Sequence, residues 1–450
     1  MPRDLAGLAG RLDIAVIGTG VAGLAAAWLL APRHRVTLYE QDERVGGHSN
    51  TVDVAGPDGP VGVDAGFVIF NEESYPNFTA LLSHLGVPTR DSGLSFAVSL
   101  GGGTIEYGGG GLPGLFGRPG NILRPGYWRM WRDMFRFYRR GPQLLKRDGA
   151  ETLTLGGYLE GEGYSREFIE HHLLPMAAAM WSSPIDDMRD HPAVAFIRFC
   201  VTHGLMRLGV RPRWKAVVGG SRAYVKELMR PFADRIRLRC RVVRISRREE
   251  KPVVRDEHGN TTQYDHVVIA SHADQALAML AEASFDEKRL LGAFTYSRNR
   301  AVLHRDERLM PRRRRVWSSW NYIGGRGVGR RPRVCVTYWI NALQSLDPRL
   351  PLFITLNPVR EPAPELVEKT FYYEHPSYQR AALRAQRELP ILQGVRNTWF
   401  CGSYFGAGLH EDALVSGLGV AEALGGVRRP WDTAAPAEAL ERLRINRAAE

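Results

Sequence analysis

The chain has 450 residues, an apolar content of 44% and a formal net charge of +12, which is enough length for two domains. The basic balance suits nucleic acid, an anionic membrane surface or an acidic substrate. Nucleic acid is the least favoured of the three, because no zinc finger, RNP-type aromatic pattern or homeodomain-like helix is present. Four widely spaced cysteines without a CxxC pair argue against a disulfide framework. Without a secretory signal segment or a spanning apolar run, we expect a cytoplasmic protein that meets the inner face of a membrane only peripherally.

The first predicted element is a strand, a glycine turn and a helix that together indicate a dinucleotide site. Residues 14–17 are an apolar run typical of a buried parallel strand, and an Ala/Leu-rich helix follows the turn. The turn reads GxGxxG. Gly18 permits a tight turn, Gly20 lets the backbone approach a pyrophosphate, and Gly23 lets the helix pack closely. The N terminus of that helix offers free N–H groups and the positive end of its dipole to phosphates.

The segments that follow indicate that the dinucleotide is FAD rather than NAD. A second strand, residues 35–39, ends in Glu40, a carboxylate placed to bind ribose hydroxyls. Residues 44–48 then read RVGGH, and residues 63–67 read VDAGF. These segments resemble the flavin amine oxidase and carotenoid desaturase superfamily, and the resemblance implies FAD. We expect the FAD to be bound non-covalently, because Cys401 has the pattern of a strand residue that faces the fold and not the flavin rim. His48 stands where that superfamily usually has arginine, so we expect its phosphate contact to be lost or pH-dependent.

Residues 398–424 resemble the closing motif of the same superfamily, a strand, a glycine turn and a helix of small residues. Gly402 and Ser403 match its Gly-Asp pair, with serine in place of aspartate. Asp412 replaces a glycine of the EGAxxSG helix. The resemblance places the start of this helix at the flavin's pyrimidine edge, where the helix dipole favours the negative charge of the reduced flavin. His410 would lie beside the isoalloxazine, where it either handles a proton or only packs at the helix start.

The candidate cofactor-binding residues extend beyond the glycine turns. A strand at residues 241–245 resembles the one that contacts the adenine side, through either Val242 or Val243. The full predicted set is Gly18, Gly20, Val21, Ala22, Gly23, Glu40, Gln41, Arg44, Gly46, Gly47, His48, Val242, Val243, Gly402, Ser403, Asp412, Ala413 and Leu414. No metal site is predicted, because the histidines at 171, 172 and 191 lack carboxylates at helical spacing.

The candidate catalytic residues are His410, Glu411 and Lys215. The first two are candidates for proton handling after a substrate hydride passes to flavin N5. Amine oxidases of the superfamily often hold a water at N5 through a lysine. Lys215 lies just before a Gly-Gly motif and is one of only six lysines, although a surface lysine is the ordinary interpretation.

These motifs predict an α/β fold, a two-dinucleotide-binding-domain flavoprotein with a Rossmann-like FAD domain and an interleaved α+β substrate domain. The FAD domain is expected at residues 12–90, 215–275 and 392–426. The substrate domain is expected at 91–214 and 276–391, and residues 427–450 form a peripheral tail that looks helical.

A narrower resemblance indicates a lipid substrate. It rests on Gly219-Gly220-Ser221-Arg222, SHADQAL at 271–277, TLNP at 355–358 and FCGSYFGAGLHED at 400–412. Together these look like a bacterial branch of amine-oxidase-like flavoproteins associated with methyltransferases of unsaturated phospholipid acyl chains. The resemblance implies a desaturase of methyl-branched acyl chains in furan fatty acid formation, with such a methyltransferase as a possible pathway partner. The alternatives are an amine or carotenoid-type oxidase, a reductase of unsaturated chains, or an FAD-bearing lipid-binding protein without catalytic activity.

Residues 124–147 give separate support for contact with lipid. The aromatic residues Trp128, Trp131, Phe135 and Tyr138 recur at helical spacing, and Arg129, Arg132, Arg136 and Arg139 follow one residue later. The segment has eight basic residues and one acid. Such a helix can lie in a headgroup layer, whereas an aromatic stripe can equally be core and an arginine row a solvated face.

Overall fold

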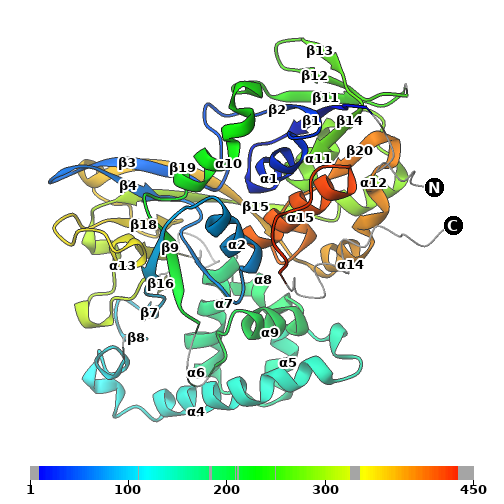
Figure 1. Cartoon of the computed structure of the whole chain (residues 1–450). Coiled ribbons are helices and arrows are strands. Elements are labelled where there is room, and N and C mark those ends of the chain that lie inside the picture. The colour runs from blue at the N-terminus through cyan, green and yellow to red at the C-terminus, as the bar shows by residue number, and fades with distance from the viewer. Residues whose placement is uncertain are drawn as a thin grey trace.

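The computed structural model describes residues 10–109, 111–181, 185–207, 209, 212–248, 250–324 and 335–433. Its upper part in Figure 1 is built on a five-stranded parallel sheet in the order β10-β2-β1-β14-β20. The strands are β1 (Asp13–Ile17), β2 (Arg35–Tyr39), β10 (Ile236–Arg237), β14 (His266–Ile269) and β20 (Thr398–Phe400). Neighbouring strands pair in parallel throughout, as the predicted Rossmann-like domain requires.

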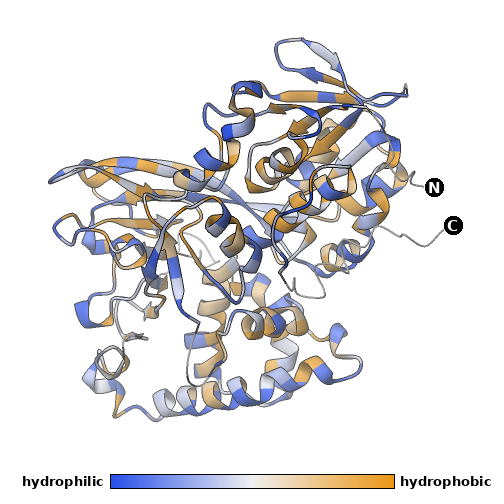
Figure 2. Cartoon of the chain, viewed as in Figure 1, coloured by the Kyte–Doolittle hydropathy of each residue, from blue (hydrophilic) through white to orange (hydrophobic). Residues whose placement is uncertain are grey.

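Both faces of the parallel sheet are buried, which explains why its strands are mostly apolar and largely orange in Figure 2. Ile14 and Val16 pack on one face with α1, α10 and α15, while Ala15 and Ile17 pack on the other with α11, α12 and α14. These helices are α1 (Val21–Leu30), α10 (Arg222–Met229), α11 (Ala273–Met279), α12 (Phe285–Leu291), α14 (Arg380–Glu388) and α15 (His410–Ala423).

A seven-stranded sheet forms the second part of the molecule, in the order β19-β15-β18-β17-β16-β7-β8. Its strands are β7 (Phe96–Leu100), β8 (Ile105–Gly108), β15 (Thr295–His304), β16 (Trp320–Gly324), β17 (Val336–Trp339), β18 (Phe353–Leu356) and β19 (Val367–Ser377). All pairs are antiparallel except β16 with β7. The sheet therefore joins strands from both of the predicted substrate-domain segments.

Helices cover one end of this second sheet and form the lower part of Figure 1. They share a core with Val98, Tyr107 and Tyr322 of the strands. They are α4 (Pro125–Arg140), α5 (Leu155–Gly161), α6 (Arg166–Phe168), α7 (Leu174–Trp181), α8 (Ile185–Asp190) and α9 (Ala193–Thr202). α4 lies at the edge farthest from the parallel sheet (Figure 1). In the part of the chain that is described, no helix has the length and apolarity to cross a bilayer.

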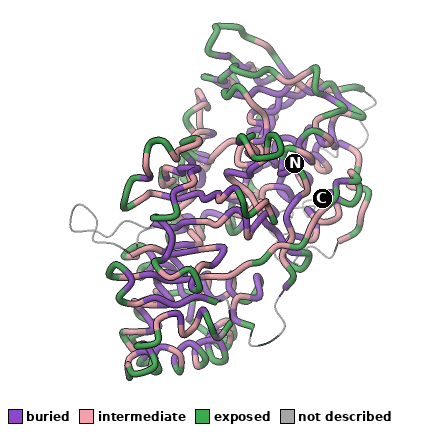
Figure 3. Tube along the Cα trace, turned by 90° about the vertical axis from the view of Figure 1, so that its left-hand side faces the viewer, coloured by how far each residue is buried: buried purple, intermediate pink, exposed green. Residues whose placement is uncertain are grey.

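Smaller elements complete the two parts. They are the sheets β3 (Thr51–Gly56) with β4 (Gly59–Asp64), β5 (Ile69–Asn71) with β9 (Trp214–Val217) and β6 (Thr89–Ser92), and β11 (Val242–Ser246) with β12 (Val253–Asp256) and β13 (Thr261–Gln263), and the helices α2 (Pro76–His84), α3 (Leu112–Leu115) and α13 (Ile340–Gln344). Buried residues run through the interior of both parts, and exposed residues lie at the periphery (Figure 3).

The strands of the parallel sheet all lie within the segments predicted for the FAD domain. However, α12 and α14 come from the segment 276–391, predicted for the substrate domain, and pack in the core against the parallel sheet. The domain boundaries therefore stay a prediction. In the tail, Trp431 stacks on Trp28 with ring centroids 5.9 Å apart. The helix expected there falls mostly on residues 434–450, which lie outside the described residues.

Candidate functional site

The GxGxxG turn has the geometry that its three glycines predict. Gly18 adopts φ +101° and its N–H donates to Tyr39 O at 2.8 Å. A Cβ on Gly23 would lie 2.0 Å from Gly18 O, so this position holds the helix against the turn. A Cβ on Gly20 would meet no atom within 4 Å, which leaves open space next to the first turn of α1. No side chain caps that helix end, and its first turn contains no acid.

The RVGGH segment packs directly on this turn. Gly46 and Gly47 have φ of +107° and +55°, a conformation that favours glycine. A Cβ on Gly47 would lie 3.1 Å from Gly20 Cα, and Arg44 Nη2 donates to Gly47 O at 2.7 Å. Glu40 is buried and accepts a hydrogen bond from Thr19 N at 3.0 Å. The two glycine segments thus form one cradle with a carboxylate at its side.

The C-terminal motif reaches the same place through a tight helix contact. α15 packs on α1 so closely that a Cβ on Gly417 would lie 2.1 Å from Ala22 O. Gly402 N–H donates to Ser416 Oγ at 2.9 Å, which ties the glycine turn to α15. Because these contacts fix the two helices together, the N-terminal ends of both helices border one cavity.

That cavity has a volume of about 1810 Å³, whereas pockets for one small ligand measure roughly 300–1,000 Å³. It has room for a dinucleotide and a second ligand. The structure brings together sixteen predicted site residues around it: Gly18, Gly20, Val21, Ala22, Glu40, Gln41, Arg44, Gly46, Gly47, His48, Val242, Val243, Gly402, Ser403, His410 and Ala413.

The remaining predicted residues have other roles in the described structure. Leu414 and Gly23 lie in the core between helix and sheet and do not line the cavity. Asp412 Oδ2 accepts from Leu409 N at 2.9 Å, so this side chain caps α15. Val242, the first residue of β11, is buried in the core, whereas Val243 is exposed and has the freer side chain at the cavity.

Two of the three catalytic candidates do not reach the cavity. Glu411 is buried and accepts three hydrogen bonds, from Asn77 N at 2.8 Å, Asn77 Nδ2 at 2.9 Å and Phe78 N at 2.9 Å. Glu411 thus accepts hydrogen bonds from the free N–H groups at the N terminus of α2. Burial raises its pKa to about 7, although these hydrogen bonds lower it. Lys215 forms an ion pair with Glu72, on the opposite face of β9 from Trp214, which does line the cavity. The structure therefore supports neither as a catalytic residue.

His410 does line the cavity, at the first residue of α15. Its ring stacks on Phe67 with centroids 3.9 Å apart and an interplanar angle of 11°. Its Nε2 lies 3.0 Å from Tyr224 Oη. Burial lowers the pKa of His410 from 6.5 to about 3. The imidazole is therefore neutral near neutral pH and is not available there as an imidazolium acid.

This burial predicts a specific acid sensitivity. Because the pKa of His410 is lower in the folded chain than in the unfolded one, its contribution to stability is present above pH 6.5 and is lost as pH falls. Relative to His410→Gln, the wild type is expected to lose about 2 kcal/mol of unfolding free energy between pH 6.5 and pH 5. Urea unfolding at the two pH values, with saturating FAD, measures this. The exposed His258 supplies the control His258→Gln, and an equal change for both variants would contradict the assignment.

His48 lies in a group of histidines beside the cradle, and the sequence motifs had assigned no role to the other two, His272 and His375. His48 lies with its ring centroid 5.7 Å from that of His375 and 6.3 Å from that of His272. Burial lowers the pKa of His48 to about 3 and that of His375 to about 4. The SHADQAL motif contains His272 and could have indicated it. His375 lies within β19, and no local pattern identifies it. With His48 neutral, its phosphate contact would be a neutral hydrogen bond rather than the charged one of arginine.

One part of the cavity is almost entirely apolar, and we call it the apolar chamber. Its walls come from α4, α7, α9 and the β7–β8 hairpin, through Phe96, Tyr107, Trp131, Met134, Phe135, Tyr138, His172, Met176, Met180 and Phe199. Its main polar feature is a contact of 3.0 Å between Tyr107 Oη and His172 Nδ1. His172 lies in a π-helical turn, Ile169–Leu173. The carboxylate residues that line the cavity, Glu40, Asp42, Asp91 and Glu374, belong to its other parts and not to these walls.

The cradle fits FAD on its own geometry. An uncapped helix N terminus beside open space at Gly20 suits an anionic pyrophosphate, and the buried Glu40 suits ribose hydroxyls. The N terminus of α15 borders the same cavity. A parallel sheet with these two helix ends defines a dinucleotide-binding flavoprotein. Within the described residues, no group of three or more potential ligands is arranged to hold a metal.

The chain belongs to the family of flavin-containing amine oxidoreductases, whose sequence model matches residues 21–303, more than half of its length. It is therefore an FAD-dependent oxidoreductase, as the sequence motifs predicted.

Solved structures with the same fold include enzymes of different kinds. A CLA-producing fatty acid isomerase from P. acnes has a TM-score of 0.63 at 16% identity, over 90% of this chain and 97% of that one. Cyclohexylamine oxidase from Brevibacterium oxydans IH-35A has a TM-score of 0.64 at 15% identity, over 92% and 99%. Putrescine oxidase gives 0.64 at 14%, over 92% and 98%. At these identities the likeness shows the fold alone. No curated protein sequence matches the chain.

Proposed function

We propose that this oxidoreductase desaturates a methyl-branched, unsaturated fatty acyl chain, carried on phospholipid. In this proposal it acts after an acyl-chain methyltransferase, at the inner face of the membrane. The observation that carries the proposal is the apolar chamber, which is continuous with the FAD cradle in one cavity. A long hydrocarbon chain gains free energy by burial in such a space, at about 0.8 kcal/mol for each CH₂ group.

The chamber favours a hydrocarbon over an amine. An ammonium group would leave water for an apolar space, at a cost that a carboxylate has to offset. No carboxylate lines the chamber walls among the described residues. A fold relative named as a fatty acid isomerase supports the view that this architecture accommodates an acyl substrate. Two other relatives are amine oxidases by name, so amine oxidation is the second candidate.

Within this proposal the chain's own residues bind, orient and exclude water. FAD, when bound, supplies the hydride acceptor for dehydrogenation. Three chamber residues, Met134, Met176 and Met180, would surround the acyl chain of the substrate and keep water from its reacting carbons. His410, held by Phe67 and Tyr224, is neutral because burial lowers its pKa, and it can form a hydrogen bond without carrying a charge.

Flavin absorbance under anaerobic conditions tests the proposal. FAD-loaded enzyme is mixed with phospholipids that carry methyl-branched monounsaturated chains, and the oxidised flavin band is followed. Bleaching with loss of two hydrogens from the acyl chain is the expected result. The straight-chain saturated phospholipid is the matched substrate control, and Met180→Trp, which fills the chamber, should slow bleaching roughly tenfold or more without loss of FAD. Bleaching by amines but by no lipid would overturn the proposal in favour of amine oxidation.

A further inference from the structure

The outer surface of α4 differs from the arrangement that its sequence predicted. Tyr138 is buried and Trp131 is half-buried, and both line the apolar chamber. The aromatic stripe is therefore divided between the interior and the surface. Trp128 and Phe135 remain about half exposed, at 50% and 49%.

The residues that do face solvent form a mixed stripe. Positions 128, 132, 135 and 139 follow each other at spacings of four, three and four, which places them on one side of a helix. All four are exposed. We call Trp128, Arg132, Phe135 and Arg139 the outer stripe. Aromatic rings thus alternate with guanidinium groups along one line of the surface.

An exposed apolar turn extends the outer stripe at its N-terminal end. Leu123 is 84% exposed and Ile122 is 47% exposed, which is unusual for two consecutive large aliphatic side chains. The indole Nε1 of Trp128 donates to Ile122 O at 2.8 Å, so this turn is held against the first turns of α4. In Figure 1 this end of the molecule is the one farthest from the parallel sheet.

The same surface borders the cavity at Phe135. Phe135 is both exposed to solvent and part of the chamber wall. The next residues inward from it, Met134 and Tyr138, also line the chamber. Phe135 therefore brings the outer stripe to the wall of the apolar chamber.

We propose that the outer stripe, with Ile122 and Leu123, docks on an anionic phospholipid bilayer, so that acyl chains reach the chamber beside Phe135. The stripe's arginines complement lipid phosphates, and its aromatic and aliphatic residues suit the boundary between headgroups and acyl chains. The surrounding segment 124–147 has eight basic residues and one acid, the buried Asp133. This inference rests on the proposed function for the identity of the substrate, but the docking itself is measured without turnover.

Sedimentation with vesicles measures the docking. FAD-loaded protein is mixed with vesicles of phosphatidylcholine alone, or of phosphatidylcholine and phosphatidylglycerol in equal parts. We expect binding to the anionic vesicles that weakens with salt, and little binding to the neutral ones. Arg132→Glu with Arg139→Glu should weaken this binding roughly 25-fold, and Leu123→Glu should weaken it several-fold.

The matched control reverses two charges elsewhere. Lys226→Glu on α10 with Arg230→Glu at the C-cap of α10 makes the same change in net charge on exposed residues. α10 lies far from α4 (Figure 1), so this pair should leave binding within twofold of the wild type. Equal losses for both charge pairs, or equal binding to neutral and anionic vesicles, would overturn the proposal. A dimer in ultracentrifugation that Leu123→Glu dissociates would also overturn it, because a second copy would then cover the stripe.

Activity separates this proposal from the proposed function. Stripe variants should retain wild-type turnover on detergent-dispersed lipid and lose it on vesicles. If no lipid is oxidised in either form, the proposed function fails, while the sedimentation result still decides the docking.

Discussion

Replacing Glu287 by alanine is expected to lower the free energy of unfolding by about 3–5 kcal/mol, because it leaves a buried guanidinium without its partner. The side chains of Arg247 and Glu287 are only 1% and 2% exposed. Arg247 Nη1 donates to Glu287 Oε1, and Arg247 Nη2 donates to Glu287 Oε2. Although burial raises the pKa of Glu287, hydrogen bonds from Arg247 and the Ser284 backbone hold it below its ordinary value. Thermal and urea unfolding measure the loss.

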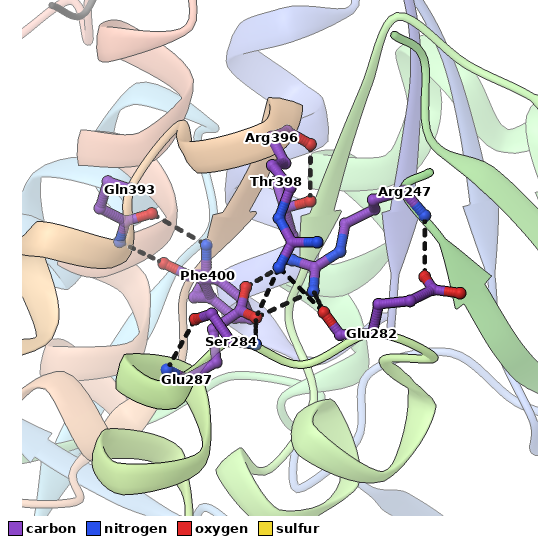
Figure 4. Close-up of polar contacts among 8 residues, drawn as sticks. All are labelled: Arg247, Glu282, Ser284, Glu287, Gln393, Arg396, Thr398 and Phe400. Atoms are coloured by element: carbon purple, nitrogen blue, oxygen red, sulfur yellow. Dashed lines mark hydrogen bonds and ion pairs between the residues drawn. The ribbon is translucent and has the colours of Figure 1, made fainter. Parts of the chain in front are cut away.

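The position of this ion pair explains why its removal should affect the whole FAD-binding part. Figure 4 shows Arg247, just after β11, reaching toward Glu287 of α12, with Arg396 beside them before β20. Arg396 Nη2 donates to Glu282 O at 2.9 Å. The network therefore ties one edge strand of the parallel sheet to the small antiparallel sheet and to α12.

Two variants distinguish an unpaired charge from a general effect of substitution. Arg247→Met with Glu287→Leu removes both charges and should recover most of the lost stability. Asp286→Ala removes the neighbouring exposed partner of Arg289 and should cost less than about 1 kcal/mol. A double variant as unstable as Glu287→Ala would show that the packing, rather than the charge, determines the loss.

The FAD cradle could be predicted from the sequence because its requirements are local. Gly18 and Gly46 adopt backbone angles that favour glycine, and Gly23 lies where any Cβ would strike Gly18 O. Such constraints act between residues that are close in the chain, so they can be recognised as a sequence motif. The same reasoning placed β1 and β2 within a residue of their observed bounds and predicted the helix that follows the turn.

The roles of Glu411 and Lys215 could not be predicted because they depend on distant contacts. Glu411 binds the N terminus of α2, 334 residues earlier in the chain, and no pattern near Glu411 records that contact. In β9 successive side chains point to opposite faces. Which face meets the cavity is set by pairing with β5 and β6, so Trp214 rather than Lys215 faces inward.

The aromatic stripe of α4 illustrates the same limit. Helical spacing placed Trp128, Trp131, Phe135 and Tyr138 on one broad face. This prediction needs only the local sequence. The division between chamber wall and outer surface depends on the angle at which α4 packs on Phe168 and the strand residue Tyr107. Tertiary packing therefore decided which aromatic residues are free to meet a partner.

Replacing Gly20 by valine is expected to abolish tight FAD binding and to leave the fold intact. The backbone at Gly20, φ −63° and ψ 172°, is accessible to any residue, and a Cβ there meets nothing within 4 Å. The cost to folding should therefore stay below about 1 kcal/mol. The side chain would extend beside the N–H groups that face the phosphates, and each charged hydrogen bond lost should weaken FAD roughly 10- to 150-fold.

The matched variant Gly23→Val separates cofactor binding from folding, since it makes the same change three residues later. There a Cβ would lie 2.0 Å from Gly18 O, so α1 must move away from the turn, and we expect a loss of about 3 kcal/mol or more of unfolding free energy. Fluorescence titration of FAD and unfolding of the apoprotein measure the two effects. If Gly20→Val also unfolds the chain, the turn is structural at both positions. If it retains FAD with unchanged affinity, the pyrophosphate does not lie against Gly20. The expected result, lost FAD on a stable fold, would place the phosphates at the N terminus of α1.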